Sequence, residues 1–276
     1  MNCKINQPLA NYAMDARALS FSYDSSIVLT DISFAIGAGE LVALIGPNGS
    51  GKTTLLKILL GLLPPASGEV TLHGQPLSTF EPKARAKTIA YVSQQPALSF
   101  PLTVRELVVL GRYPHGGRGK ESAADTLAVA KALEHTAAGH LGNRQFNTLS
   151  GGEKQKVLIA RALAQSARII LLDEPTLHLD LYFQLQILSG LKQLCVAERM
   201  TVIAVLHDVN LISLFADQAL LLSGGELRGF GPVADVINEQ SIKGLLDVDM
   251  TAITANDART RYFVPRDPMG TMPIRR

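Results

Sequence analysis

Three short runs of apolar residues mark the strands that the sequence predicts. They lie within residues 40–46 (ELVALIG), 168–175 (RIILLDEP) and 200–208 (MTVIAVLHD), and each is almost continuous in aliphatic side chains. Such runs are typical of strands that are buried on both faces of a parallel sheet. Each run ends in glycine or polar residues, at the end of the strand where α/β sheets bind ligands. The pattern therefore predicts an α/β fold with its chemistry gathered at one edge of a sheet.

The stretch between the first two runs has a mostly helical pattern. TVRELVVLGRY, AADTLAVAKALEHTAAGHLG and TLSGGEKQKVLIARALAQ each predict a helix, all within residues of about 94–166. The flanking residues 14–93 and 167–230 supply the strands, so we expect a helical subdomain inserted into a split core. Residues 231–276 form a separate C-terminal part, in which PVADVINEQSIKGLLDVDM predicts one short amphipathic helix before RYFVPRD and a basic tail that is ordered only in part.

Composition narrows the class of protein without fixing its chemistry. The 276 residues are 47% hydrophobic and 18% charged with a net charge of +2, as in an ordinary globular protein, so a dedicated nucleic-acid binder is not favoured. Cys3 and Cys195 are too few and too far apart for a disulfide framework or a metal site, which suits a reducing cytosol. There is no secretory signal and no run of about 18 apolar residues, so we expect that the chain does not itself cross a membrane.

The first run leads into GPNGSGKT, residues 46–53, which fits G-x-x-x-x-G-K-[ST] at every required position. Glycines let the backbone curl so that successive N–H groups point at phosphate oxygens, and the helix that follows turns its positive end toward them. Lys52 would neutralise the β- and γ-phosphates of a nucleotide, and the Thr53 hydroxyl would bind Mg²⁺. The predicted nucleotide site here comprises Gly46, Pro47, Asn48, Gly49, Ser50, Gly51, Lys52, Thr53 and Thr54.

The second and third runs end in titratable side chains. Asp173 can hold Mg²⁺ through water, and Glu174 can orient and deprotonate an attacking water. The plainer interpretation of this pair is two solvated carboxylates in a turn that Pro175 enforces. His207 ends the third run, where a lone histidine is more often structural than catalytic. Agreement among the three strand ends is what favours a catalytic site.

The start of the third predicted helix, at TLSGGE, raises a separate question. Ser150 and Glu153 have the spacing of a capping box, yet Gly151 and Gly152 stand between them and each disfavours a helix by about 1 kcal/mol. Such a helix leaves its first N–H groups bare. They could serve an anion, or the segment could be an ordinary capped helix.

With these motifs in order, residues of about 14–230 resemble the ATP-binding cassette (ABC) family, whose signature matches LSGGE at residues 149–153. The resemblance implies a P-loop NTPase (RecA-like) core with a mixed sheet, a small antiparallel β part and an inserted helical subdomain. Tyr23 then matches the aromatic residue that stacks on adenine, although alone it would be a half-buried strand tyrosine. Asp180 matches the aspartate of the loop after the acidic motif, and His178 in that loop has no assigned role.

The resemblance also assigns the chemistry. ATP and Mg²⁺ are the implied cofactors, with Gln94 as the glutamine that touches Mg²⁺ and the water, although alone Gln94 would be a loop amide. His207 is the implied switch histidine. The implied catalytic residues are therefore Glu174, His207, Lys52 and Gln94, and the implied metal ligands are Thr53, Gln94 and Asp173.

In this family two cassettes pack head to tail as a nucleotide sandwich. Ser150, Gly151 and Gly152 would then cap the γ-phosphate held on the P-loop of a second copy, which implies a homodimer because the chain shows no internal repeat. Glycine permits a close backbone approach that a side chain would block.

TVRELV together with GRYPH resembles bacterial importers of iron chelates such as siderophores, of haem and of cobalamin, and more loosely of molybdate. That resemblance implies a separate polytopic permease, a substrate-binding protein acting through it, and a peripheral place on the cytoplasmic face of the inner membrane, with no nucleic acid. Tyr113 and His115 could suggest an iron site, but a locally folded loop is the favoured interpretation. The alternatives are a soluble cassette acting on the ribosome or DNA, and an exporter. The substrate is left open.

Overall fold

The computed structural model describes residues 12–94, 101–116, 121–254 and 260–266. Cys3, the basic tail from residue 267 and most of the glycine-rich loop at 115–120 lie outside the described residues.

A six-stranded mixed sheet forms the centre of the molecule. Five of its strands are parallel, and β10 runs antiparallel to its neighbour at one edge. In spatial order the strands are β10 (Glu226–Pro232), β9 (Gln218–Ser223), β3 (Leu41–Ile45), β8 (Thr201–Val205), β7 (Ile169–Leu172) and β6 (Ile89–Val92). Every residue of β3, β7 and β8 is buried, as the three apolar runs predict.

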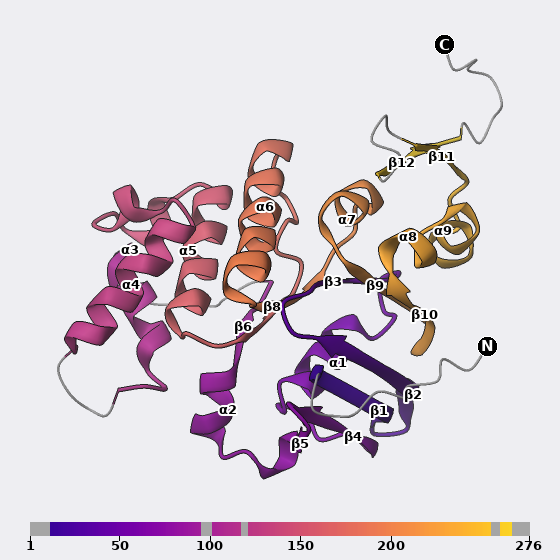
Figure 1. The fold of residues 1–276 in the computed structure, drawn as a ribbon, viewed down its shortest axis with the longest axis horizontal. Helices are drawn as coiled ribbons and strands as arrows, with labels where there is room; N and C mark the ends of the chain where they lie inside the picture. The colour runs from indigo at the N-terminus through magenta and orange to yellow at the C-terminus, as the bar shows by residue number, and fades with distance from the viewer. Residues whose placement is uncertain (1–11, 95–100, 117–120, 255–259, 267–276) are drawn as a thin grey trace.

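Two smaller sheets accompany it. The first is antiparallel, in the order β2 (Ser26–Gly37), β1 (Tyr12–Tyr23), β4 (Ser67–Leu72) and β5 (Gln75–Pro76). The second is a hairpin of β11 (Met250–Thr254) and β12 (Arg261–Pro265). The small antiparallel sheet lies next to the first helix, while the hairpin lies at the opposite side of the molecule (Figure 1).

Helices surround the central sheet. Figure 1 shows three of them, α3 to α5, gathered beside α6 and away from the antiparallel sheet. The α-helices of the described residues are α1 (Lys52–Leu59), α2 (Pro82–Thr88), α3 (Val104–Val109), α4 (Ala123–His135), α5 (Gly151–Ala164), α6 (Leu181–Glu198), α7 (Val209–Phe215), α8 (Val233–Val236) and α9 (Glu239–Leu246).

Strand β3 shows how one sequence serves two cores. Leu41, Ala43 and Ile45 pack with the core that includes α5, α6 and α7, whereas Val42 and Leu44 pack with α1 and the antiparallel sheet. Alternate side chains of a strand point to opposite faces, so a continuous apolar run is needed where both faces are covered. The central sheet is therefore fixed between two apolar layers, and only its strand ends are left for chemistry.

The C-terminal part differs from the sequence-based expectation. The single amphipathic helix expected after residue 231 is wrong, because α8 and α9 are two short helices separated at Asn238. The Asn238 side chain accepts the Ser241 N–H and starts α9 as its N-cap. RYFVPRD contributes β12, which pairs with β11. No helix within the described residues is long and apolar enough to span a bilayer.

Candidate functional site

The P-loop joins β3 to α1 in a conformation that depends on glycine. A Cβ on Gly46 would lie 2.0 Å from the carbonyl oxygen of Leu222, so no other residue fits there. Gly49 and Gly51 have φ values of +78° and +101°, a left-handed backbone that other residues rarely adopt. Helix α1 begins directly after Gly51 without a side-chain cap, so its first amides are left for an anion.

Lys52 lies inside this loop and holds it closed. Its side chain is only 7% exposed, and Nζ donates to the carbonyl oxygens of Gly46 and Pro47 at 2.9 Å each. Burial lowers the pKa of the Lys52 ammonium, and the nearby Glu174 and Asp173 carboxylates partly oppose that shift. A buried cation next to bare helix amides suits the phosphates of a nucleotide.

The hydroxyl of Ser50 provides a test of whether this loop fits a ligand. Ser50 is 2% exposed and, among the described residues, its Oγ has no hydrogen-bond partner. Buried polar atoms are normally paired, so an orphaned hydroxyl within a loop of amides fits a missing polar group such as phosphate.

Asp173 lies directly after β7 and is 6% exposed. Its N–H donates to the carbonyl of Val92 at 2.9 Å, which anchors it beside β6. Burial raises the pKa of the Asp173 carboxyl, and a hydrogen bond from Thr53 opposes this shift. The pairing of a carboxylate with a threonine hydroxyl supplies the oxygen ligands that Mg²⁺ prefers, so both residues fit a Mg²⁺ site.

Tyr91 is a member of this site that the sequence interpretation missed. Its hydroxyl donates to Asp173 Oδ2 at 3.3 Å, and burial together with the Asp173 charge raises the pKa of Tyr91 well above its usual range. The available signal was the tyrosine within IAYVSQ, three residues before Gln94, on the strand beside β7.

Glu174 unites three segments that are distant in sequence. Gln94 donates a hydrogen bond from its side-chain amide to one carboxylate oxygen, and His207 Nε2 lies 2.9 Å from the other. The Glu174 backbone has φ of +54°, a left-handed conformation that is uncommon outside glycine. The side chain is 15% exposed and that of His207 is 41% exposed, so the group faces solvent at the strand ends. A carboxylate held from both sides can orient and deprotonate a water.

The predicted adenine-stacking residue lies apart from this group, at the end of β1. Tyr23 is 45% exposed, and its ring stands edge to face against Phe21 with centroids 4.8 Å apart. An exposed aromatic ring supported by a neighbour is suited to stacking on a base.

The signature segment, residues 149–153, has the capping box that the sequence predicts. Ser150 Oγ accepts the Glu153 N–H at 3.3 Å, and Glu153 accepts the Ser150 N–H at 2.8 Å. Arg144, which the sequence interpretation missed, donates to Glu153 at 3.1 Å. The hydrogen bonds from Ser150 and the Arg144 charge lower the pKa of Glu153. Within the described part of the chain, the amides of Gly151 and Gly152 donate no hydrogen bond.

The two glycines of this segment differ in their surroundings. Gly151 is exposed, and a Cβ there would meet only Leu179, at 3.7 Å. Gly152 is buried, and a Cβ there would lie 2.5 Å from Cγ of Phe183 in the same chain. Phe183 of the same chain therefore leaves no room for a side chain at position 152. Asp180 also has a local task, since Oδ1 accepts the Phe183 N–H at 3.0 Å and caps α6.

Three other residues singled out from the sequence lie away from this site. His115 Nε2 is 2.7 Å from the carbonyl oxygen of Gln165 at the C-terminal end of α5, and Tyr113 is 84% exposed. His178 is exposed, with φ of +62°, and turns the chain between β7 and α6.

Comparison with known proteins adds the family. The ABC transporter family matches residues 29–177. Among curated relatives, the hemin import ATP-binding protein HmuV of Thermobifida fusca is 39% identical over 87% of this chain and 84% of its own length. The cobalamin import ATP-binding protein BtuD of Halobacterium salinarum is 36% identical over 85% of this chain, which spans only 58% of that relative.

Solved structures agree with this assignment. An inward-facing metal-chelate type ABC transporter matches with a TM-score of 0.83 and 31% identity, over 94% of this chain and 99% of that one. A dimeric bacterial ABC transporter cassette matches with a TM-score of 0.71 and 31% identity, over 80% of this chain and 98% of that one. With the P-loop, the paired carboxylates and the signature segment in one fold, this chain belongs to the ABC transporter family.

Proposed function

We propose that this chain is the ATP-hydrolysing subunit of a bacterial-type ABC importer, which powers uptake of an iron complex (a siderophore or haem) or a related chelate such as cobalamin. The observation that carries the ATPase assignment is the convergence of Gln94 and His207 on Glu174, one residue after Asp173. The importer class is supported by relatives named for hemin and cobalamin import and by a metal-chelate type structure.

The chemistry follows from the residues of the site. The P-loop amides and Lys52 bind the triphosphate, and Tyr23 stacks on the adenine. Thr53, Asp173 and Gln94 would hold Mg²⁺, which when bound neutralises phosphate charge as a Lewis acid. Glu174 takes the proton of the attacking water. His207 and Lys52 then stabilise the charge that gathers on the γ-phosphoryl group.

Assembly follows from the signature segment. Ser150 caps α5 and, within the described residues, the amides of Gly151 and Gly152 are bare, so the segment can bind the γ-phosphate on a second copy. Two copies would enclose two nucleotides, with Asp180 at the contact between them. Gln94 would relay closure to a permease at the cytoplasmic face of the membrane, which receives substrate from a binding protein. Residues 14–230 form the ATPase domain in this assignment, with residues 94–166 as its helical insertion and 231–276 as an appendage.

The decisive variant is Glu174→Gln. It keeps the size of the side chain but cannot take a proton, so hydrolysis falls by about 10²- to 10⁴-fold while ATP binding persists. We expect a closed dimer to accumulate with ATP, measured by size-exclusion chromatography with light scattering. Glu134→Gln, on the exposed side of α4, is the matched control and keeps full turnover. Near-normal hydrolysis by Glu174→Gln would remove Glu174 from the role.

The importer class needs a test of its own. Co-purification from membranes with a polytopic protein, followed by uptake of haem, a ferric siderophore or cobalamin into vesicles that contain the complex, would support it. Sedimentation with ribosomes, or no association with a membrane protein, would instead favour a soluble cassette.

A further inference from the structure

We propose that Phe183 is a positioning residue. Its ring packs on the signature segment of the same chain and holds that segment where it can contact the γ-phosphate of a second copy. The inference rests on the proposed function, because it concerns how that segment reaches the γ-phosphate of a second copy. Phe183 lies in the first turn of α6, next to the loop that carries Asp180, whereas the signature segment starts α5.

Four side chains form a closed cycle at this point, here called the Phe183 cluster. Lys156 Nζ lies 5.1 Å from the centre of the Phe183 ring and donates to Gln186 Oε1 at 2.6 Å. The Gln186 amide donates to the Tyr182 hydroxyl at 2.6 Å, and the Tyr182 ring packs edge to face on Phe183 with centroids 5.6 Å apart. A cation on one side and a ring on the other leave the Phe183 side chain little freedom to turn.

The Phe183 cluster fits against the glycine of the signature segment. A Cβ on Gly152 would lie 2.5 to 2.7 Å from three atoms of the Phe183 ring, so the ring packs directly on the backbone of the first helical turn. Lys156 is one turn further along α5 and faces the same ring. The segment is thus supported from behind at two successive turns of its own helix.

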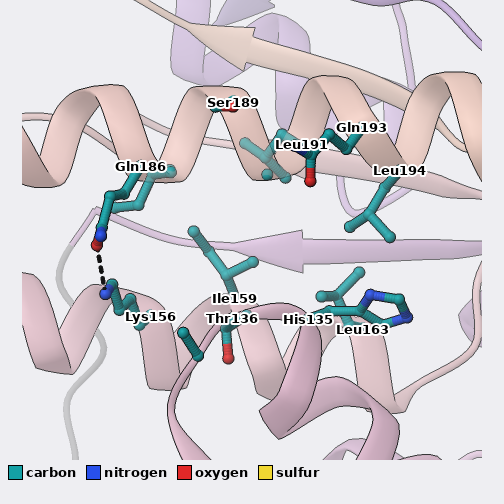
Figure 2. A pocket seen from close by; sticks show the side chains of 13 residues that line it. His135, Thr136, Lys156, Ile159, Leu163, Gln186, Ser189, Leu191, Gln193 and Leu194 are labelled. Atoms are coloured by element: carbon teal, nitrogen blue, oxygen red, sulfur yellow. Dashed lines mark hydrogen bonds between the residues drawn. The ribbon is translucent and has the colours of Figure 1, made fainter.

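Beyond the Phe183 cluster a pocket lies between α5 and α6. This pocket has a volume of about 270 Å³. Figure 2 shows Ile159 and Leu163 of α5 on one side of it and Leu191 and Leu194 of α6 on the other. The Lys156–Gln186 hydrogen bond crosses this gap near the signature end (Figure 2). At the far end His135 Nε2 lies 3.2 Å from Glu198. The Phe183 cluster therefore packs α5 against α6 at the end of this pocket where the signature segment begins.

One further bond extends this link to the dimer-facing loop. Asp180 caps α6 by accepting the Phe183 N–H, so the residue that supports Gly152 is itself anchored to Asp180. A change in the position of Asp180 would move the Phe183 ring, and with it the amides of Gly151 and Gly152. Two parts of the proposed dimer contact are therefore mechanically joined inside each copy.

The first test separates binding from closure. In the Glu174→Gln parent, Phe183→Ala should bind the fluorescent nucleotide TNP-ATP as a monomer with an affinity within about twofold of the parent, because the P-loop is untouched. ATP-driven dimerisation of this double variant should weaken at least tenfold by analytical ultracentrifugation. When Phe183→Ala is made in the chain that keeps Glu174, kcat for ATP hydrolysis should fall without a matching rise in KM. Phe183→Tyr, which keeps the ring, should restore both. Unchanged dimerisation, or equal loss of monomer binding, would overturn the proposal.

The second test uses a double-mutant cycle at Gly152. Gly152→Ala should weaken dimerisation in the parent but add little in the Phe183→Ala background, because the clashing ring is gone. Gly151→Ala is the matched control, since 3.7 Å of space leaves it independent of Phe183. If Gly152→Ala is equally harmful in both backgrounds, the partner's phosphate alone requires the glycine and the proposal fails. A parent that never dimerises with ATP would instead count against the proposed function.

Discussion

Helices α1 and α5 both have glycine at or directly before their first residue, but their N-termini are capped in opposite ways. At α1 the residue before the helix is Gly51, with a left-handed backbone and no side-chain cap. At α5 the same position is Ser150, which forms a full capping box with Glu153 and is reinforced by Arg144. One helix start is left incomplete for a ligand, whereas the other is complete within the chain and still keeps two amides free.

The difference shows how the N-terminus of each helix stays folded when no nucleotide is bound. The P-loop is folded by Lys52 and two backbone carbonyls, so its amides can stay uncapped without the loop unfolding. In the proposed function the signature segment meets a phosphate only when a second copy binds. A side-chain cap contributes about 1 kcal/mol and holds the segment ready without using its first two amides.

Among changes at these two helix starts, removal of the Lys52 side chain should have the largest effect, and the effect is on ATP affinity. Lys52→Ala deletes the buried cation and leaves the carbonyls of Gly46 and Pro47 without their donor, so we expect ATP affinity to fall by about 100-fold or more. Equilibrium dialysis with radiolabelled ATP measures it, with circular dichroism to check the fold. The matched control is Lys154→Ala, a lysine of α5 that is half-buried beside the signature segment, which should leave monomer binding intact. Tight ATP binding by Lys52→Ala would contradict the role assigned to the P-loop.

A change at Ser150 should separate capping from anion binding. Ser150→Asp keeps an N-cap and therefore the stability of α5, but its negative charge opposes a phosphate, so ATP-driven dimerisation of the Glu174→Gln form is lost. Ser150→Ala should instead lower the free energy of unfolding by about 0.5–2 kcal/mol through loss of the cap. Urea unfolding and sedimentation measure the two effects. Full dimerisation by Ser150→Asp would mean that this helix start meets no anion.

The smallest effect should come from pH acting on the capping box. The folded-state pKa of Glu153 lies below its ordinary value of 4.5, because Ser150 and Arg144 stabilise the carboxylate. A depressed pKa adds stability that is present above about pH 4.5 and is lost as pH falls through the folded-state pKa. Glu153→Gln should therefore be slightly less stable than the unmodified chain at pH 7, and the difference should disappear once the pH lies below the folded-state pKa of Glu153, by urea unfolding. A difference that persists at low pH would show that the charge of Glu153 is not its source.

Sequence reasoning was strongest where a local pattern had a single structural solution. The apolar runs became β3, β7 and β8, and the capping box at Ser150 has the expected bonds. It was weakest in the C-terminal part, where Asn238 divides one expected helix into two. It also missed Tyr91 and Arg144, because neither belongs to a motif; Tyr91 acts through Asp173, which is distant in the chain, and Arg144 through Glu153, nine residues further on.

By itself the sequence determined the two glycine-rich helix starts, the strand ends that carry carboxylates, and the family that combines them. These depend on backbone freedom, local caps and burial, which neighbouring residues settle. Only the tertiary structure decided that Gln94 and His207 meet on Glu174, and that Gly152 is covered by Phe183 of its own chain. Such contacts join segments across the sheet or between helices, and their geometry follows from how two cores pack around the central strands.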